Sequence, residues 1–393
     1  MGPLQHINTS SKKISIPLSE PHIAGNEWKY VKECLDTGWV SSVGAYVDKF
    51  EKMIAGYVGA KYAVAVVNGT SALHVSLIVS GVTAGDEVIV PTLTFIAPVN
   101  VIRYCGASPV FMDCDPDTLC LDIIKFNDFI NRETEQRTDG FTYNKKTQNR
   151  IKAVIPVHIF GHPVDMDGMI AICKERNIDV IEDATESIGS EYKGRKTGSI
   201  GKVGCFSFNG NKIITTGGGG MIVTNDERIA KRARHLTTQA KCDPLEYDHD
   251  EIGYNYRLTN IQAAMGVAQM ERLDEFISIK RKNATIYRAL LSSIADVKIF
   301  TEEPYANSNF WFYTISVPPV AKKPLMDDLL KKGIQVRPLW KLIHSLPLYA
   351  GFQTYKIEDA PVAYERCLNL PCSVSMEKKH IDFVADNIRR FFS

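Results

Sequence analysis

The 393-residue sequence lacks several features that would assign it to a familiar class of protein. It has almost no net charge, because 46 basic and 45 acidic residues leave a balance of +1. A nucleic-acid-binding protein normally carries a basic patch or stripe, so this composition indicates no such partner. Apolar runs such as 63–67 and 88–90 are too short to span a bilayer, and the N-terminal MGPLQHINTSSKK has no apolar core of the secretory kind.

Cysteine pairs with regular spacing are also missing. The nine cysteines are odd in number and form no CxxC motif, which argues against a disulfide scaffold and against a zinc site. We therefore expect reduced thiols, a cytoplasmic protein and no metal. No GxxxxGK[ST] or GxGxxG follows the first strand, so loops that bind nucleoside triphosphates or dinucleotides are not expected there.

What the sequence does have is a regular alternation between about residues 61 and 225. Short apolar runs such as AVAVV, DEVIVP and IDVIED alternate with helical stretches such as TSALHVSLIVSG. Uninterrupted apolar strands separated by helices predict an α/β fold with a mostly parallel sheet covered on both faces. Ligands of such sheets bind beyond the carboxyl ends of the strands.

The second half has a different organisation. A long helical stretch follows Arg257, and a smaller α+β region with the strand candidates WFYTISV and IQVRP comes after it. We therefore predict a large domain over residues 1–260 and a linking helix with a small C-terminal domain over 261–393. The polar segment from Glu133 to Arg150 is expected to be an exposed loop.

Two motifs directly after strands could bind a ligand. In VVNGTSALH the chain turns at Gly69, and Thr70 and Ser71 open a helix whose free N–H groups could hold an anion. The alternative is an ordinary N-cap formed by Thr70 or Ser71. In PTLTFIAP, Phe95 could lie against an aromatic ligand or could simply belong to the core.

Three further motifs carry charged or polar side chains. VIEDATESIGS places Asp183 at the end of an apolar strand with Glu186 three residues on, either as a ligand-binding pair or as a helix cap. FSFNGNKIITTGGGGM carries Lys212, a candidate nucleophile or a plain surface lysine. IGYNYRLTNIQAAMG carries Asn255 and Arg257, which suit anion recognition or helix capping.

Together these parts fit one ligand, because an anion cradle, a stacking ring, an acid and a lysine are what pyridoxal 5′-phosphate (PLP) requires. The whole chain from about Ile16 resembles the nucleotide-sugar aminotransferases of the DegT/StrS type. The resemblance rests on motifs in the same order as in that family: NGTSALH, PTLTFIA, PVHIFGHPVDMD, IEDATESIGS, GCFSFNGNKIITTGGGGM and GYNYRLTNIQAAMG. It implies an aspartate-aminotransferase-like fold (fold type I of PLP enzymes).

The resemblance also implies roles for single residues. Lys212 matches the lysine that links to the cofactor and moves protons, and Asp183 matches the acid that pairs with the ring nitrogen. Glu186 stands where the family often has glutamine, so its contact with the ring is open. The other implied cofactor contacts are Phe95 for stacking and Gly69, Thr70, Ser71 and Ser207 for the phosphate. Asn255 matches a residue that reaches the phosphate of the neighbouring subunit, which implies a homodimer with shared active sites.

The substrate is expected to be a nucleotide sugar, with L-glutamate as amino donor. The segments FNGNKIITTGGGGM and VRPLWKLIHSLP resemble the branch that acts on UDP-2-acetamido-2,6-dideoxy-hexos-4-ulose at carbon 4, on the way to bacillosamine- or legionaminic-acid-type glycans. The expected substrate contacts are Asn209, Arg257, Trp340 and His344. The alternatives are a GDP-4-keto-6-deoxymannose 4-aminotransferase that makes perosamine, and a PLP-dependent sugar dehydratase.

Overall fold

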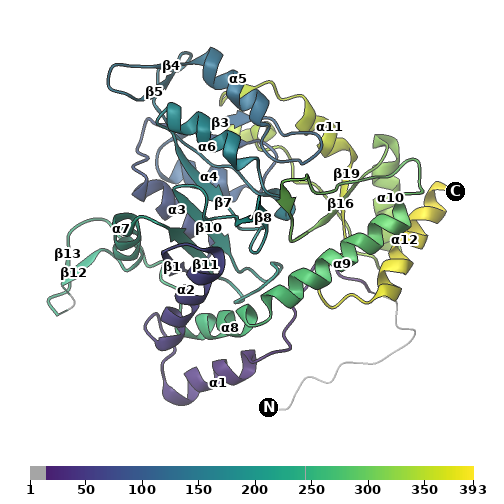
Figure 1. Cartoon of the computed structure of the whole chain (residues 1–393), viewed down its shortest axis with the longest axis horizontal. Coiled ribbons are helices and arrows are strands. Elements are labelled where there is room, and N and C mark those ends of the chain that lie inside the picture. Colours follow the sequence, from purple (N-terminus) through teal and green to yellow (C-terminus); the bar gives the residue numbers. More distant parts are fainter. Residues whose placement is uncertain (1–14, 244) are drawn as a thin grey trace.

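The computed structural model describes residues 15–243 and 245–393, and its centre is an eight-stranded sheet (Figure 1). Strand β11 runs antiparallel to both of its neighbours, and the remaining neighbours pair in parallel. The order across the sheet is β1 (Tyr62–Val66), β11 (Gly220–Thr224), β10 (Val203–Ser207), β7 (Asp179–Asp183), β6 (Ile151–Val154), β2 (Glu87–Pro91), β3 (Ser108–Met112) and β18 (Thr354–Tyr355).

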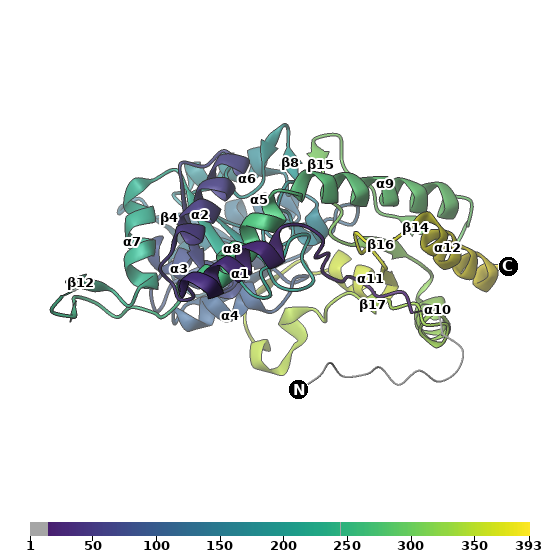
Figure 2. The same ribbon diagram turned by 90° about the horizontal axis from the view of Figure 1, so that it is seen from below.

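Helices cover both faces of this sheet, as the alternation in the sequence predicted. Helix α3 contacts α4 and α7 on one face, and α5 contacts α6 on the other (Figures 1 and 2). The expected alternation of strands and helices between about residues 61 and 225, and the mostly parallel sheet, are therefore confirmed. The bounds are α3 (Gly69–Val79), α4 (Ala97–Tyr104), α5 (Ile123–Glu133), α6 (Met166–Glu175) and α7 (Glu227–Thr237).

The long helical stretch after Arg257 is two helices. Helix α8 (Asn260–Met270) packs on α1 (Glu27–Thr37) and α2 (Ala45–Val58), and α9 (Leu273–Leu291) leads toward the C-terminal part (Figure 1). Arg272, with φ −120° and ψ 4°, is not helical and separates α8 from α9. The two helices therefore contact different parts of the molecule.

The C-terminal part is built on a four-stranded antiparallel sheet. Its strands are, in order, β14 (Lys298–Ile299), β16 (Tyr313–Ser316), β19 (Cys367–Leu370) and β17 (Arg337–Pro338). The helices of this part are α10 (Pro319–Lys331), α11 (Asp359–Arg366) and α12 (Lys378–Phe392), and the 3₁₀ turns η2 (Ile343–Ser345) and η3 (Pro347–Tyr349) lie between β17 and β18. Helix α12 lies beside α9 (Figures 1 and 2).

Two segments cross the domain boundary that the sequence predicts near residue 260. Strand β18 leaves the C-terminal part and adds to the edge of the large sheet beside β3. Ile16, near the start of the described chain, pairs with Ile334 of the C-terminal part. The division into 1–260 and 261–393 stays a prediction, and its first 14 residues lie outside the described chain.

Smaller pieces of structure lie at the periphery. The segment Glu133–Arg150 is not a plain loop, because it contains the hairpin of β4 (Thr134–Gln136) and β5 (Thr142–Asn144). A second hairpin, β12 (Lys241–Asp243) with β13 (Asp248–His249), projects as an arm from the body (Figure 2). A three-stranded sheet joins β15 (Ala306–Asn307), β8 (Glu191–Tyr192) and β9 (Arg195–Lys196).

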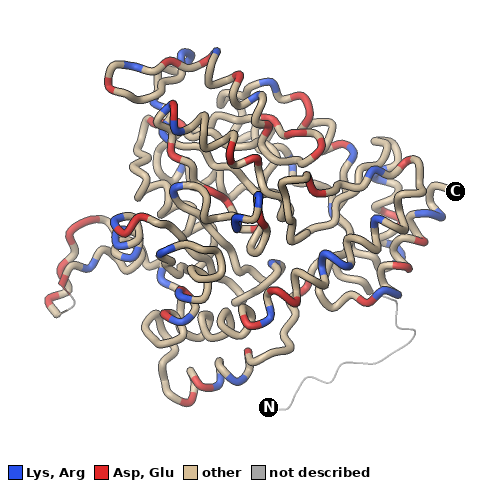
Figure 3. The backbone as a smooth tube through the Cα atoms, viewed as in Figure 1, with Lys and Arg blue, Asp and Glu red and all other residues tan. Residues whose placement is uncertain are grey.

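Charge and cysteines show no specialised pattern. Acidic and basic residues are interspersed over the whole trace (Figure 3), in keeping with the even charge balance. All nine cysteines are free thiols within the described part of the chain. Among the residues that the structure describes, no helix is both long enough and apolar enough to cross a membrane.

Candidate active site

A cleft of about 620 Å³ opens where β1, β2, β7 and β10 end. Residues that follow these four strands line its inner part, and Trp311, Phe312 and the segment 337–340 of the C-terminal part line its outer part. This volume lies within the range of small-molecule sites. The position matches the expectation that ligands bind beyond the carboxyl ends of parallel strands.

The first turn of α3 forms one end of the cleft. Asn68 is the N-cap of this helix, and its side chain accepts the N–H of Ser71 at 2.7 Å. The cap is therefore neither Thr70 nor Ser71, and the N–H of buried Ser71 is already used. Gly69 and Thr70 line the cleft, and their N–H groups belong to the helix start, where no intrahelical partner exists.

Gly69 also brings other strand ends close to this turn. A Cβ atom at residue 69 would lie 2.9 Å from Cβ of Ser207 and 3.1 Å from Cγ2 of Thr185. Only glycine allows this approach. The result is a concave cradle of N–H and hydroxyl groups with the positive end of a helix dipole, which suits a phosphate.

Lys212 reaches the middle of the cleft from the loop after β10. Its Nζ lies 3.7 Å from the ring centroid of Trp311 and 3.6 Å from Oε1 of Glu186. The side chain is only 12% exposed. Burial lowers the pKa of this amine, while the carboxylates of Glu186 and Asp183 act in the opposite direction. A lowered pKa is what a nucleophilic lysine needs.

The loop of Lys212 is fixed by two hydrogen bonds to its neighbour. The carbonyl oxygen of Asn211 accepts the indole N–H of Trp311 at 2.8 Å and the hydroxyl of Ser19 at 3.0 Å. One donor comes from the N-terminal segment and the other from the C-terminal part, so both ends of the chain help to position the lysine.

Asp183 ends β7 and is almost completely buried. Its Oδ1 accepts the N–H of Thr185 at 3.1 Å. Burial raises the pKa of this carboxyl, and hydrogen bonds from Thr185 and the charge of Lys212 oppose that effect. A buried carboxylate with so few partners is costly unless a cation or a proton-bearing group meets it, so Asp183 favours a cationic group on the ligand.

Glu186 is held in place by an unusual turn. Its Oε2 accepts the N–H of Phe160 at 2.8 Å, and Phe160 adopts a left-handed conformation with φ 54°. Such a conformation is uncommon for a bulky residue. Burial raises the pKa of Glu186 to about 7, which places its charge change near neutral pH.

Aromatic side chains from the loop after β2 and from the C-terminal part form an aromatic wall of the cleft. Phe95 is 51% exposed and meets Trp340 edge to face with ring centroids 5.9 Å apart. Trp340 in turn lies 5.2 Å from Phe160 and 6.5 Å from Trp311. These rings can enclose a flat ligand, and the exposed ring of Phe95 remains available for stacking.

The glycine run lies against the cradle. Gly217 has φ +79° and Gly219 has φ +144°, which side chains rarely adopt. A Cβ atom at Gly220 would lie 2.4 Å from the carbonyl oxygen of Asn68. The run therefore allows a tight turn and a close approach of β11 to the helix cap.

Four predicted site residues do not line this cleft, and one of them is Ser71, whose N–H is bound to Asn68. Arg257 donates from Nη1 to Glu51 Oε1 at 2.5 Å and to Ala65 O at 3.2 Å, so within this chain it forms a buried structural ion pair. His344 Nδ1 lies 2.6 Å from Thr92 Oγ1, which ties it to the loop after β2. Asn255 is exposed and outside the lining. Placement in one chain thus gives no support to substrate contacts by Arg257 and His344.

The remaining predicted residues come together in the cleft: Gly69, Thr70, Phe95, Asp183, Glu186, Ser207, Asn209, Lys212 and Trp340. The sequence analysis missed several lining residues, namely Thr94, Thr185, Asn211, Trp311, Arg337 and Asn369. Trp311 and Asn369 lie outside every site motif recognised in the sequence, so no local signal points to them. The other four had a signal, since each lies within a motif or segment already recognised: Thr94, Thr185, Asn211 and Arg337.

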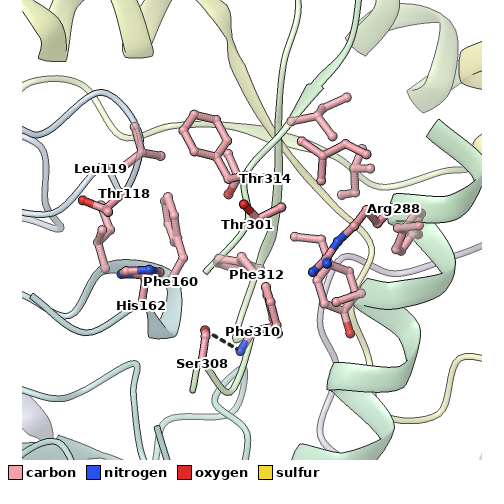
Figure 4. Close-up of a pocket in the computed structure, with 18 of the residues that line it drawn as sticks. Thr118, Leu119, Phe160, His162, Arg288, Thr301, Ser308, Phe310, Phe312 and Thr314 are labelled. Carbon is pink, nitrogen blue, oxygen red and sulfur yellow. Dashed lines mark hydrogen bonds between the residues drawn. The ribbon is translucent and has the colours of Figure 1, made fainter. Parts of the chain in front are cut away.

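A second cavity adjoins the cleft at Phe312 (Figure 4). Phe312 lines both this cavity and the cleft, while His162, Arg288 and Phe310 belong to the second cavity only. At about 50 Å³ it has room for a few water molecules. It is too small for a sugar nucleotide, so the cleft is the candidate active site.

A large mostly parallel sheet with a buried lysine and a buried aspartate at its carboxyl edge defines a fold type I PLP-dependent enzyme. The comparison with protein families gives the narrower assignment. Residues 21–389 match the DegT/DnrJ/EryC1/StrS aminotransferase family, and the chain belongs to this family of PLP-dependent sugar aminotransferases.

Individual relatives agree with this assignment. The chain is 40% identical over 382 residues to a GDP-perosamine synthase of Escherichia coli O157:H7, covering 96% of this chain and 99% of the relative. It is 40% identical over 373 residues to a GDP-perosamine synthase of Caulobacter vibrioides, covering 94% and 96%. A DegT DnrJ EryC1 StrS aminotransferase from Brucella abortus superposes with a TM-score of 0.86 at 27% identity, covering 94% and 95% of the two chains.

These relatives correct one expectation. They support PLP as cofactor and an aminotransferase of sugars, but they give no support to the UDP-linked bacillosamine branch that the sequence analysis favoured. They agree better with the GDP-linked alternative.

The described residues fit the cofactor. The cradle at Gly69 suits its phosphate, Asp183 suits a protonated ring nitrogen, and Lys212 suits its aldehyde. The hydroxyl of Thr94 lines the cleft and is buried without a hydrogen-bond partner among the described residues. A buried polar atom of this kind normally has a partner, and a group bound in the cleft would supply one.

Proposed function

We propose that this protein transfers an amino group from L-glutamate to carbon 4 of a GDP-linked 4-keto-6-deoxy sugar of the mannose type, giving a GDP-4-amino sugar. The product would serve polysaccharide biosynthesis. The observation that carries the choice of sugar is the end-to-end identity of 40% to two proteins named GDP-perosamine synthase. The reaction type rests on the family and on the cleft around Lys212.

In this proposal Lys212 holds the cofactor and then moves a proton. PLP, when bound, withdraws electrons from the carbon that carries the amino group. The burial of the amine favours a neutral lysine that can accept and return a proton, although the carboxyl of Glu186, 3.6 Å away, acts in the opposite direction. Trp311 limits the positions that Nζ can take.

Asp183 and the cradle at Gly69 would position the cofactor relative to Lys212. The carboxylate of Asp183 would keep a ring nitrogen protonated, because a buried anion stabilises a nearby cation. Gly69, Thr70 and Ser207 would bind the phosphate, and Phe95 would stack on the ring. Since these groups come from the ends of rigid strands, their spacing is fixed before the ligand arrives.

We also propose a homodimer in which Asn255 serves the partner's site. Asn255 is exposed and does not line the cleft of its own chain, as expected for a residue that acts across an interface. Large apolar side chains are exposed on α1 and the turn after it and on the arm of β12 and β13, which is typical of an interaction surface. They include Trp28, Leu35, Trp39, Leu245, Tyr247 and Ile252.

The acceptor sugar can be tested directly. The enzyme is incubated with L-glutamate and either GDP-4-keto-6-deoxymannose or UDP-2-acetamido-2,6-dideoxy-hexos-4-ulose, and sugar products are identified by mass spectrometry. We expect the GDP sugar to be aminated with stoichiometric release of 2-oxoglutarate. Amination of the UDP sugar alone would reject the proposed acceptor, and loss of water without amination would indicate a dehydratase.

The shared site can be tested by subunit mixing. A Lys212→Ala subunit and an Asn255→Ala subunit are inactive or weak alone. If Asn255 acts across the interface, a mixed dimer contains one intact site and activity returns. If no activity returns although mass spectrometry shows mixed dimers, Asn255 does not act in the partner's site.

A further inference from the structure

We propose that Arg337 and Asn369 form an anion-binding subsite in the outer half of the cleft, which holds a carboxylate of the amino donor or the diphosphate of the nucleotide sugar. Both groups present anionic oxygens to the same cation. The inference rests on the proposed function, because it concerns the reactants of that reaction.

The two residues are neighbours on the small antiparallel sheet. Arg337 of β17 is paired directly with Asn369 of β19, and both side chains line the cleft. Directly opposed residues on antiparallel strands have Cβ atoms about 5 Å apart. A ligand oxygen group between them can therefore be reached by both side chains.

The guanidinium of Arg337 is only partly used. Its Nη1 donates to its neighbour's carbonyl, Val336 O, at 2.8 Å and to Gln335 Oε1 at 3.1 Å. Within the described residues no carboxylate lies within ion-pair distance of Arg337, and Nη2 and Nε have no hydrogen-bond partner. Arginine has five donors in a planar fork that matches carboxylate and phosphate oxygens, so most of this capacity is left for a ligand.

Asn369 is buried but not fully engaged. It is 3% exposed, and its Oδ1 accepts the hydroxyl of Thr314 at 2.7 Å. Because Oδ1 is the acceptor, the amide orientation is set and the Nδ2 donors remain. In the described chain Nδ2 has no partner. A buried amide whose donor end borders a cleft is suited to bind a ligand oxygen.

The charge of the cleft favours such a subsite. Four ionisable side chains line it: Asp183, Glu186, Lys212 and Arg337. The first three surround the cofactor position, and two of them are acidic. Glutamate has two carboxylates and a nucleotide sugar has a diphosphate, so each reactant needs a cation. Arg337 is the one cation that the described part of this chain offers beside Lys212.

The test measures binding to the cofactor-loaded enzyme. Calorimetry gives the dissociation constants of 2-oxoglutarate and of GDP for wild type, Arg337→Gln and Arg337→Lys, and initial rates give KM for glutamate and for the keto sugar. We expect Arg337→Gln to weaken at least one ligand roughly 10- to 100-fold, which is the usual size for a hydrogen-bonded charge. Arg337→Lys should recover only part, since it keeps the charge and loses the fork.

Comparison of 2-oxoglutarate with GDP shows whether Arg337 binds the carboxylate or the diphosphate. Weaker binding of 2-oxoglutarate alone assigns Arg337 to the carboxylate, and weaker binding of GDP alone assigns it to the diphosphate. The absorbance spectrum of the bound cofactor should not change in either variant. Arg228→Gln removes the same charge from an exposed position of α7 outside the cleft and should leave both ligands unaffected.

A second variant probes Asn369 without a change of shape. Asn369→Asp keeps an acceptor for Thr314 but places a carboxylate beside Arg337, and we expect it to weaken the same ligand as Arg337→Gln. Unchanged binding of both ligands in folded Arg337→Gln protein overturns the inference. If wild type fails to aminate the GDP sugar, only the proposed acceptor fails, because 2-oxoglutarate binding remains measurable.

Discussion

The amine of Lys212 lies 3.6 Å from the carboxyl of Glu186, and both groups are almost completely buried. Burial lowers the pKa of the lysine and raises that of the glutamate. In each of these two side chains, the free-energy difference between the charged and the neutral form at neutral pH is therefore smaller than it is in water. A proton at this position can be exchanged near neutral pH, which suits an enzyme that must add and remove protons in the same cycle.

Removal of the amine should abolish turnover. We expect Lys212→Ala to lower the amination rate by at least about 1,000-fold, because a positioned acid or base contributes on the order of 100- to 10,000-fold and the covalent link to the cofactor is lost as well. Borohydride treatment should label wild type and not the variant. Lys49→Ala, an exposed position on α2, serves as control. A wild-type rate in Lys212→Ala would remove Lys212 from the mechanism.

Neutralising Asp183 should slow the reaction without unfolding the protein. Asp183→Asn leaves the shape of the site but no longer stabilises a proton on the ring nitrogen. We expect single-turnover rates to fall by two or more orders of magnitude, roughly the size of an acid–base contribution. Asp179→Asn is the matched control, since Asp179 begins the same strand and pairs with Lys152 and Lys202 outside the cleft. Equal rates in both variants would contradict the assignment.

Glu186 should make stability depend on pH. Its pKa rises from 4.5 to about 7 in the folded protein, so in this window the folded state binds more protons than the unfolded state. The free energy of unfolding therefore falls as pH rises through the window, at up to about 1.4 kcal/mol for each unit of pKa difference.

Glu186→Gln removes this titration. We expect the variant to gain stability relative to wild type at about pH 8 compared with about pH 5, in urea unfolding of cofactor-free protein. The opposite trend, or parallel curves for the two proteins, would show that Glu186 does not titrate in this range.

The glycine run should tolerate little change next to the helix cap. A methyl group at Gly220 would meet the carbonyl oxygen of Asn68 at 2.4 Å and Gly69 N at 2.8 Å. We expect Gly220→Ala to cost about 1–3 kcal/mol, as overpacking does, and to weaken PLP binding measured by fluorescence titration. Gly210→Ala has open space around it and should be close to neutral. Similar behaviour of the two variants would show that the cradle adapts.

The ion pair of Glu51 and Arg257 should be structural. Glu51 accepts hydrogen bonds from Arg257, from Arg234 at 2.7 Å and from the N–H of Ala65 at 2.8 Å. Glu51→Ala leaves Arg257 buried without its partner, which costs about 3–5 kcal/mol. Asp48→Ala, exposed on the same helix, should change stability by less than about 0.5 kcal/mol. Denaturation midpoints compare the two, and an undestabilised Glu51→Ala protein would leave Arg257 free for another role.

Much of the fold follows from local pattern. The apolar run that ends at Asp183 is a strand, as its uninterrupted character predicts. The helix that begins at Gly69 is also where the sequence places it. The break at Arg272 was not predicted, because the apolar periodicity continues across it and only packing against different partners separates α8 from α9.

The sequence by itself determined the order of strands and helices and the family, and it predicted which lysine and which acid serve the site. These features depend on motifs and spacings that involve only residues close together in the sequence. Tertiary structure decided which groups face the cleft. In the folded chain Arg257 forms an ion pair with Glu51, and His344 contacts Thr92. The cleft at the strand ends is also lined by residues of the distant C-terminal part, namely Trp311, Arg337 and Asn369. The physical reason is that side chains distant in sequence come into contact only when the sheets pack against each other. A polar group that becomes buried then forms a hydrogen bond with a partner that lies close to it in the folded chain.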